Sequence, residues 1–160
     1  MNTTASFDTL LEQTVGLRQM ITSLLKAIPE DKVNAMPPTW SNNARWHAGH
    51  LIITPYLLTY GIAGKPLPVP EEYRKWFAKG TTPKDWGTAS IPGYDDLVNE
   101  IVPMISRLFE EWRDQMDEPY AEPYMTSVGV VLRTPGEALR FSLAHDGIHL
   151  GLLLALRRAL

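Results

Sequence analysis

Hydrophobic residues recur at three- and four-residue intervals in four long stretches of the chain. The stretches cover residues 7–28, 41–61, 94–116 and 134–160. This spacing places the apolar side chains on one side of an α-helix, and it is typical of a helix that buries one face. Pro55 and Pro103 fall inside the second and third stretches, where we expect a kink or a break. The pattern predicts an all-α protein, a four-helix bundle.

The fourth predicted helix has the clearest start signal in the sequence. Thr134 can cap its N-terminus, Pro135 falls at the first helical position, and Glu137 completes a capping box. For the second predicted helix, Ser41 or Asn42 can serve as the N-cap.

Two long connections separate the predicted helices. The first, residues 63–91, joins the second helix to the third, is rich in proline and contains Trp76, Phe77 and Trp86. These rings could roof a pocket, form a dimer contact or extend the core, because connections of this length are often functional. The second connection, residues 118–133, precedes the fourth helix and contains a short segment at 127–131 that we expect to be extended or a hairpin.

The composition fits a single domain that spans residues 1–160. The chain is 44% hydrophobic and 21% charged, which is sufficient for one buried core. Its formal net charge of −3 disfavours a nucleic-acid partner, because phosphate recognition requires a basic surface. The N-terminus is polar, and the apolar segment at residues 150–156 is far shorter than the ~20 residues of a membrane span. We therefore expect a cytoplasmic protein without a membrane partner.

The chain contains no cysteine, which excludes disulfides, cysteine-type zinc sites and a cysteine nucleophile. Its four histidines form two pairs: His47 and His50 in the second predicted helix, and His145 and His149 in the fourth. On an α-helix a step of four residues rotates the side chain by about 40°, and a step of three by about 60° in the other direction. Each pair can therefore direct its imidazoles to one point, and imidazole is the commonest ligand for zinc, nickel, copper and iron.

Both pairs contribute to predicted core faces. His145 and His149 share a face with four residues that we assign to the core side of the last helix. These are Ser142, Leu152, Leu153 and Leu156. His50 lies in the apolar stripe of the second helix, so packing of the two helices would bring three imidazoles together. Three histidine ligands with an open fourth position are typical of a catalytic metal site.

Two questions stay open at this point. The buried histidines could instead form a hydrogen-bond network with Thr54, Ser142 and tyrosine hydroxyls, since buried polar rings need partners. His47 could be a fourth ligand, a base next to the ligands, or a half-exposed ring beside Trp46; we favour a role other than ligand.

Two motifs carry a resemblance to a known family. The segment from Trp40 to Leu51 (WSNNARWHAGHL) and the segment from His145 to Gly151 (HDGIHLG) resemble the DinB-like (YfiT-type) superfamily, in the same order along the chain. The resemblance implies a four-helix bundle in which one histidine of the second helix and two of the last surround a divalent ion. The family's Gly-His pair falls on His50, and its final pair falls on His145 and His149. Many members continue the last motif with Gly-Gln, whereas Leu152 follows the glycine here.

The resemblance also implies a range of functions. Members of the superfamily include thiol-dependent transferases and isomerases that use bacillithiol, mycothiol or glutathione. They also include metal-bearing domains of ergothioneine-type synthases. We therefore expect a divalent metal ion, zinc or nickel, in a transferase or hydrolase-like enzyme that combines a small thiol with an electrophile. Members commonly pair, so we expect a homodimer. The alternative is a metal-binding or stress-response bundle without turnover.

Three further residues near the second pair have open roles. Asp146 lies about 100° around the helix from His145. It could accept a hydrogen bond from a ligand imidazole on another helix, or it could be a capping or surface charge. Gly147 and Gly151 lower helix propensity, and we attribute them to the close approach of another helix.

Overall fold

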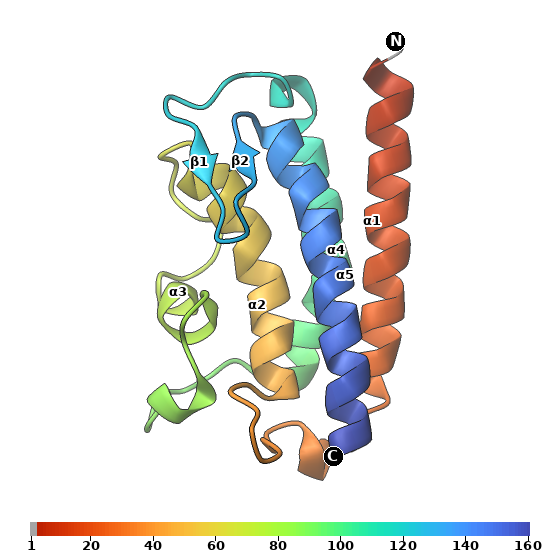
Figure 1. Cartoon of the computed structure of the whole chain (residues 1–160), viewed down its shortest axis with the longest axis vertical. Helices are drawn as coiled ribbons and strands as arrows, with labels where there is room; N and C mark the ends of the chain where they lie inside the picture. The colour runs from red at the N-terminus through yellow and green to blue at the C-terminus, as the bar shows by residue number, and fades with distance from the viewer. Residues whose placement is uncertain (1–2) are drawn as a thin grey trace.

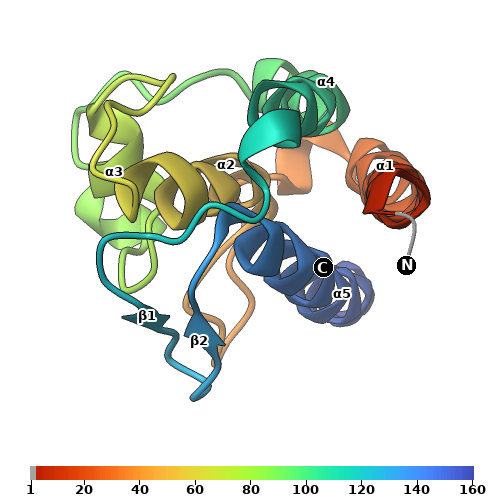
Figure 2. The same ribbon diagram turned by 90° about the horizontal axis from the view of Figure 1, so that it is seen from above.

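Four long helices form the body of the molecule. The computed structural model describes residues 3–160, with side chains from Ser6 onward. The helices are α1 (Thr3–Lys26), α2 (Ala44–Tyr56), α4 (Tyr94–Trp112) and α5 (Pro135–Ala159). They lie side by side, and α1 and α2 each pack against both α4 and α5 (Figures 1 and 2). The expectation of an all-α protein with four long helices is confirmed.

The helix ends follow from local side-chain chemistry. Asn43, rather than Ser41 or Asn42, caps α2, because its side chain accepts a hydrogen bond from the Trp46 N–H at 2.9 Å. Thr134 caps α5 as predicted, accepting from the Glu137 N–H at 3.2 Å. The Glu137 carboxylate accepts a hydrogen bond from the Arg133 N–H at 2.7 Å. In a capping box it would accept from the N–H of the N-cap residue, Thr134, which is one residue later.

The two internal prolines have different effects. The regular part of α2 ends at Tyr56, directly after Pro55, and the chain continues as the π-helical turn η2 (Leu57–Gly61). A wider turn accommodates the N–H that proline lacks. In contrast, α4 runs without interruption through Pro103, which is exposed to solvent.

The connections contain short elements. A 3-10 turn, η1 (Glu30–Lys32), follows α1; α3 (Glu72–Phe77) and the 3-10 turn η3 (Pro83–Asp85) lie between α2 and α4. After α4 come η4 (Arg113–Gln115) and an antiparallel pair, β1 (Tyr124–Met125) with β2 (Val131–Leu132). The predicted hairpin is therefore present, but residues 127–130 form its turn rather than a strand. Within the described chain, no helix is both long and apolar enough to cross a membrane.

The core lies between the four helices, with α2 almost entirely buried. On α5 the buried stripe is shifted from the predicted one. It consists of Leu139, Ser142, Asp146, His149, Leu153 and Leu156. The assignment of Leu152 to the core was wrong, because 40% of this residue is exposed. The buried stripe keeps three- and four-residue spacing, so Leu153, and not its neighbour Leu152, occupies the buried position.

Gly147 and Gly151 do not serve the purpose that we assigned to them. Among the described residues, no side chain and no backbone of another element lies within 4 Å of the place where a Cβ would be at either position. Both glycines are on the exposed side of α5, so the predicted close approach of another helix does not occur within the described part of the chain.

Candidate metal centre

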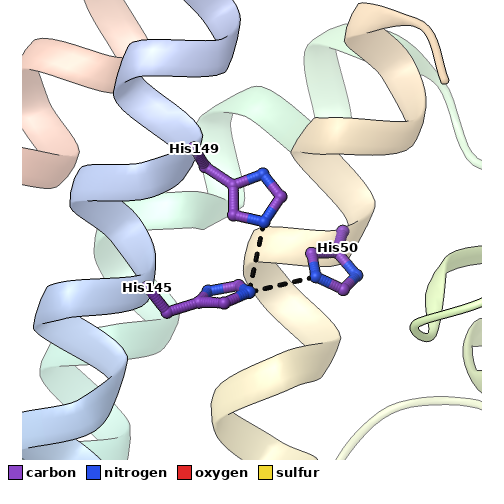
Figure 3. A group of neighbouring side chains, drawn as sticks. All are labelled: His50, His145 and His149. Atoms are coloured by element: carbon purple, nitrogen blue, oxygen red, sulfur yellow. Dashed lines mark hydrogen bonds between the residues drawn. The ribbon is translucent and has the colours of Figure 1, made fainter. Parts of the chain in front are cut away.

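Three imidazoles meet between α2 and α5. His50 comes from α2, and His145 and His149 come from consecutive turns of α5 (Figure 3). The Nε2 atom of His145 lies 3.1 Å from the Nε2 atom of His50 and 3.1 Å from that of His149. One ring nitrogen from each residue lies within 4.8 Å of the others, so the three could hold a metal ion. The structure thus brings together the three histidines that the sequence predicted as ligands.

The orientation of His50 is set by the connection between α2 and α4. Its Nδ1–H donates to the Phe77 carbonyl oxygen at 2.6 Å, since a carbonyl can only accept. The His50 ring also stacks on Trp46, with ring centroids 4.4 Å apart. With the proton on Nδ1, the neutral ring presents the Nε2 lone pair to the centre, as metal ligation requires.

Gly49 explains how Phe77 reaches this position. The Phe77 ring is fully buried against α2, and a Cβ on residue 49 would lie 2.4 Å from it. Glycine is therefore required for the close approach that brings the Phe77 carbonyl to His50. Of the three roles considered for the loop aromatics, Phe77 fits the extension of the core, and Trp76 and Trp86 pack partly buried beside it.

We predict that Gly49→Ala destabilises the protein by about 1–3 kcal/mol, because the added methyl group overpacks against the Phe77 ring. Alanine's better helix propensity, worth about 1 kcal/mol, opposes this loss only in part. Gly147→Ala is the matched control: its Cβ meets open space, so it should be neutral or stabilising. Urea unfolding of the metal-free variants measures both effects. Equal or greater stability of Gly49→Ala would show that Phe77 is not held as described.

The imidazoles are neutral at pH 7. Burial lowers the pKa of His50 and His145 from 6.5 to about 4; repulsion between the protonated His50 and His145 rings adds to the shift of His50, and the Arg18 charge adds to that of His145. Burial and the adjacent histidines also lower the pKa of His149. Metal ions bind the neutral form of imidazole, so these environments keep the ligand form available over a wide pH range.

The same shifts predict acid sensitivity of the metal-free protein. Burial also lowers the pKa of His47 to about 4, so all four histidines take up protons more readily in the unfolded chain. Stability should therefore be complete above pH 6.5 and fall as the pH decreases towards 4. The raised pKa of the buried Asp146 carboxyl acts in the opposite sense.

Urea unfolding midpoints at pH 7 and pH 5 in the presence of a chelator measure this effect. His145→Gln should show a smaller difference between the two pH values, because one titrating group is gone. Equal stability of the wild-type protein at both pH values would contradict the prediction.

The spacing of the donor atoms is compatible with a divalent ion as well as with hydrogen bonds between the rings. In a tetrahedral zinc site with Zn–N bonds of about 2.0–2.1 Å, two nitrogens are about 3.3–3.4 Å apart, close to the 3.1 Å seen here. Only part of the alternative network exists: Thr54 Oγ1 lies 3.2 Å from His50 Nε2, but the Ser142 hydroxyl donates to Ala138 in its own helix.

A buried ion pair lies next to the three histidines. Arg18 of α1 donates through Nε and Nη2 to the two carboxylate oxygens of Asp146, at 2.7 and 3.0 Å, and both side chains are fully buried. Arg18 also donates to the carbonyl oxygens of Leu51 at 2.9 Å and Ile101 at 3.1 Å. One side chain thus links all four long helices. Asp146 is neither the surface charge nor the partner of a ligand imidazole that we considered.

Arg18 was missed in the sequence, although a signal was present. It falls at helical spacing between Thr14 and Ile21, inside the buried stripe of α1. A charged residue in such a stripe requires a buried partner of opposite charge, and Asp146 is in the corresponding stripe of α5.

His47 contacts one of the three histidines but is not part of the candidate metal centre. Its Nδ1 is 2.9 Å from Nδ1 of His149, the nitrogen that points away from the other two rings. It is buried, with 3% of its surface exposed, so the half-exposed alternative is wrong.

The fold and the site together define a class: an all-α protein with a buried cluster of three histidines that could hold a metal ion. A family model, that of the DinB superfamily, matches residues 13–153. Because the match covers most of the chain, the protein belongs to the DinB superfamily. The search of curated proteins found no match.

Proposed function

We propose that this protein is a metal-dependent enzyme that transfers a low-molecular-weight thiol to an electrophile. A divalent ion, zinc or nickel, is held by the Nε2 atoms of His50, His145 and His149. The observation that carries the proposal is the convergence of these three nitrogens from two helices, with one proton position already fixed by the Phe77 carbonyl.

We propose that small molecules reach the centre from the side of His145 and Thr54. His50 and His149 are buried, but His145 and Thr54 are partly exposed. The Thr54 hydroxyl, 3.2 Å from His50 Nε2, is placed to hydrogen bond with a molecule that enters from this side. Three protein ligands with an accessible further position favour a catalytic centre over a structural one.

The absence of cysteine is consistent with an external thiol, because the 160 residues supply none. A bound divalent ion lowers the pKa of a coordinating thiol and so supplies a thiolate at neutral pH. In the net reaction a carbon–sulfur bond forms, the thiol proton passes to solvent, and the leaving group departs from the electrophile with its bonding electrons.

A cavity lies beyond the end of α2, and its lining residues include none of the three histidines. Its volume is about 410 Å³, and it includes Leu57, the first residue of η2. Its walls come from η2, α3 and the segment that leads into β1. They consist of Leu57, Leu58, Gly61, Ile62, Arg74, Glu122, Pro123 and Tyr124.

Metal analysis and a thiol screen test the proposal. Protein purified without nickel resin should contain about one divalent ion per chain. The zinc- or nickel-loaded protein should then accelerate conjugation of glutathione, bacillithiol or mycothiol to a chromogenic electrophile. His145→Ala should lose both metal and activity. Stoichiometric metal without activity towards any thiol would favour the alternative, a metal-binding bundle without turnover, and absence of metal binding would overturn the proposal altogether.

A further inference from the structure

The fourth histidine occupies a specific place relative to the three that converge. The rings of His47 and His149 meet at 67° with their Nδ1 atoms 2.9 Å apart, while Nε2 of His149 points to His145. Nε2 of His149 therefore faces the candidate metal centre, and its Nδ1 faces His47. His47 contributes no nitrogen to the group of ring nitrogens that could hold an ion, among the residues that the structure describes.

A contact between two imidazole nitrogens requires one shared proton. If His47 donates, Nδ1 of His149 is the acceptor, and its proton must sit on Nε2, facing the other histidines. If His149 donates, its Nε2 carries the lone pair that a metal ligand needs. Only the second arrangement is compatible with the proposed centre, and in it His47 accepts.

The hydrogen-bond partner of His50 differs in chemistry from that of His149. The Phe77 carbonyl can only accept, so it fixes His50 in the ligand form permanently. His47 can accept or donate, so the form of His149 depends on where the proton of His47 resides. When His149 is in its ligand form, Nε2 of His47 carries a hydrogen. This buried atom has no hydrogen-bond partner within the described part of the chain.

We infer that His47 is a positioning residue that holds His149 in its Nδ1-protonated form and thereby makes its Nε2 available to the metal ion. This inference rests on the proposed metal site. It assigns His47 neither to the ligands nor to the general bases.

Two substitutions separate this role from others. Asparagine places an amide oxygen near the position of Nδ1, so His47→Asn keeps an acceptor for His149. Leucine fills the space without one. Loss of an outer hydrogen bond to a metal-bound histidine lowers affinity by about 10- to 100-fold. We expect this loss for His47→Leu, and a zinc affinity within about threefold of wild type for His47→Asn.

Competition titration with Zn²⁺ measures the affinities, and the absorption spectrum of the Co²⁺-loaded protein reports the number of ligands. Nitrogen NMR of the zinc-loaded wild-type protein reports the protonation of His149 and depends on no variant. The inference requires a proton on Nδ1 of His149, and a Co²⁺ spectrum that is the same for wild type and His47→Asn. An unprotonated Nδ1 in the zinc-loaded protein, wild-type affinity of His47→Leu, or a changed Co²⁺ spectrum of His47→Asn would each overturn it.

The outcome is distinguishable from failure of the proposed function. Absence of zinc binding by the wild-type protein refutes the metal site itself. Zinc binding that requires His50, His145 and His149 but is unchanged in His47→Leu refutes only the role of His47. Failure of the thiol screen affects neither result, because no measurement here uses turnover.

Discussion

Arg18→Met is expected to destabilise the folded protein by about 3–5 kcal/mol, the range for breaking a buried ion pair by removing one partner. The substitution leaves the carboxylate of Asp146 uncompensated in a place with no exposure to solvent. It also removes the donors that satisfy the carbonyl oxygens of Leu51 and Ile101. Methionine retains much of the length of the side chain, so loss of packing contributes little.

Urea unfolding compares Arg18→Met with a matched surface control and with a double variant. Arg133→Met removes an exposed pair with Glu137 and should cost less than about 1 kcal/mol. Arg18→Met/Asp146→Leu removes both charges and should recover much of the lost stability, because an apolar replacement of the whole pair is often neutral. If Arg18→Met is as stable as Arg133→Met, the pair does not hold the helices together.

The ion pair also matters for the candidate metal centre. Arg18 binds the carbonyl of Leu51, the residue after His50, and the side chain of Asp146, the residue after His145. It therefore fixes the two helices whose relative position brings the three imidazoles together. The Arg18 charge that fixes α2 and α5 therefore comes from α1, a helix that contributes no histidine to the cluster.

Much of the fold follows from local information. Helical periodicity located the four long helices, and the Thr134–Pro135 start of α5 was predicted to the residue because capping depends only on neighbours in sequence. The face of α5 was predicted less well. Leu152 and Leu153 are both apolar, and only packing against the other helices decides which of the two is buried.

The candidate site was predictable only in its central residues. Spacing alone indicates that His145 and His149 lie on one side of a helix, and the resemblance selected His50 over His47. The surrounding groups depend on contacts between distant segments. Phe77 acts through its backbone carbonyl, which carries no sequence signal, and Arg18 and Asp146 are 128 residues apart. The environment of a site is determined by tertiary packing, whereas its ligands are marked by residue type.

His50→Gln, His145→Gln and His149→Gln should each weaken zinc binding more than 100-fold. The reason is that each removes a direct ligand, whereas loss of an outer hydrogen bond alone weakens binding by about 10- to 100-fold. The effect appears in stability as well as in affinity. At free zinc of 100 times the wild-type Kd, binding stabilises the wild-type protein by about 2.7 kcal/mol. A variant whose Kd is raised 100-fold gains only about 0.4 kcal/mol at the same concentration.

Denaturant unfolding at fixed free zinc, with and without a chelator, measures this difference for each variant. The chelated samples serve as the control, because they separate the lost zinc stabilisation from any effect of the substitution on the metal-free fold. Glutamine keeps a polar side chain, so the metal-free variants should fold. A zinc-dependent gain in His145→Gln equal to that of the wild-type protein would show that the ion binds elsewhere, and the three converging imidazoles would then be a hydrogen-bonded cluster without a metal.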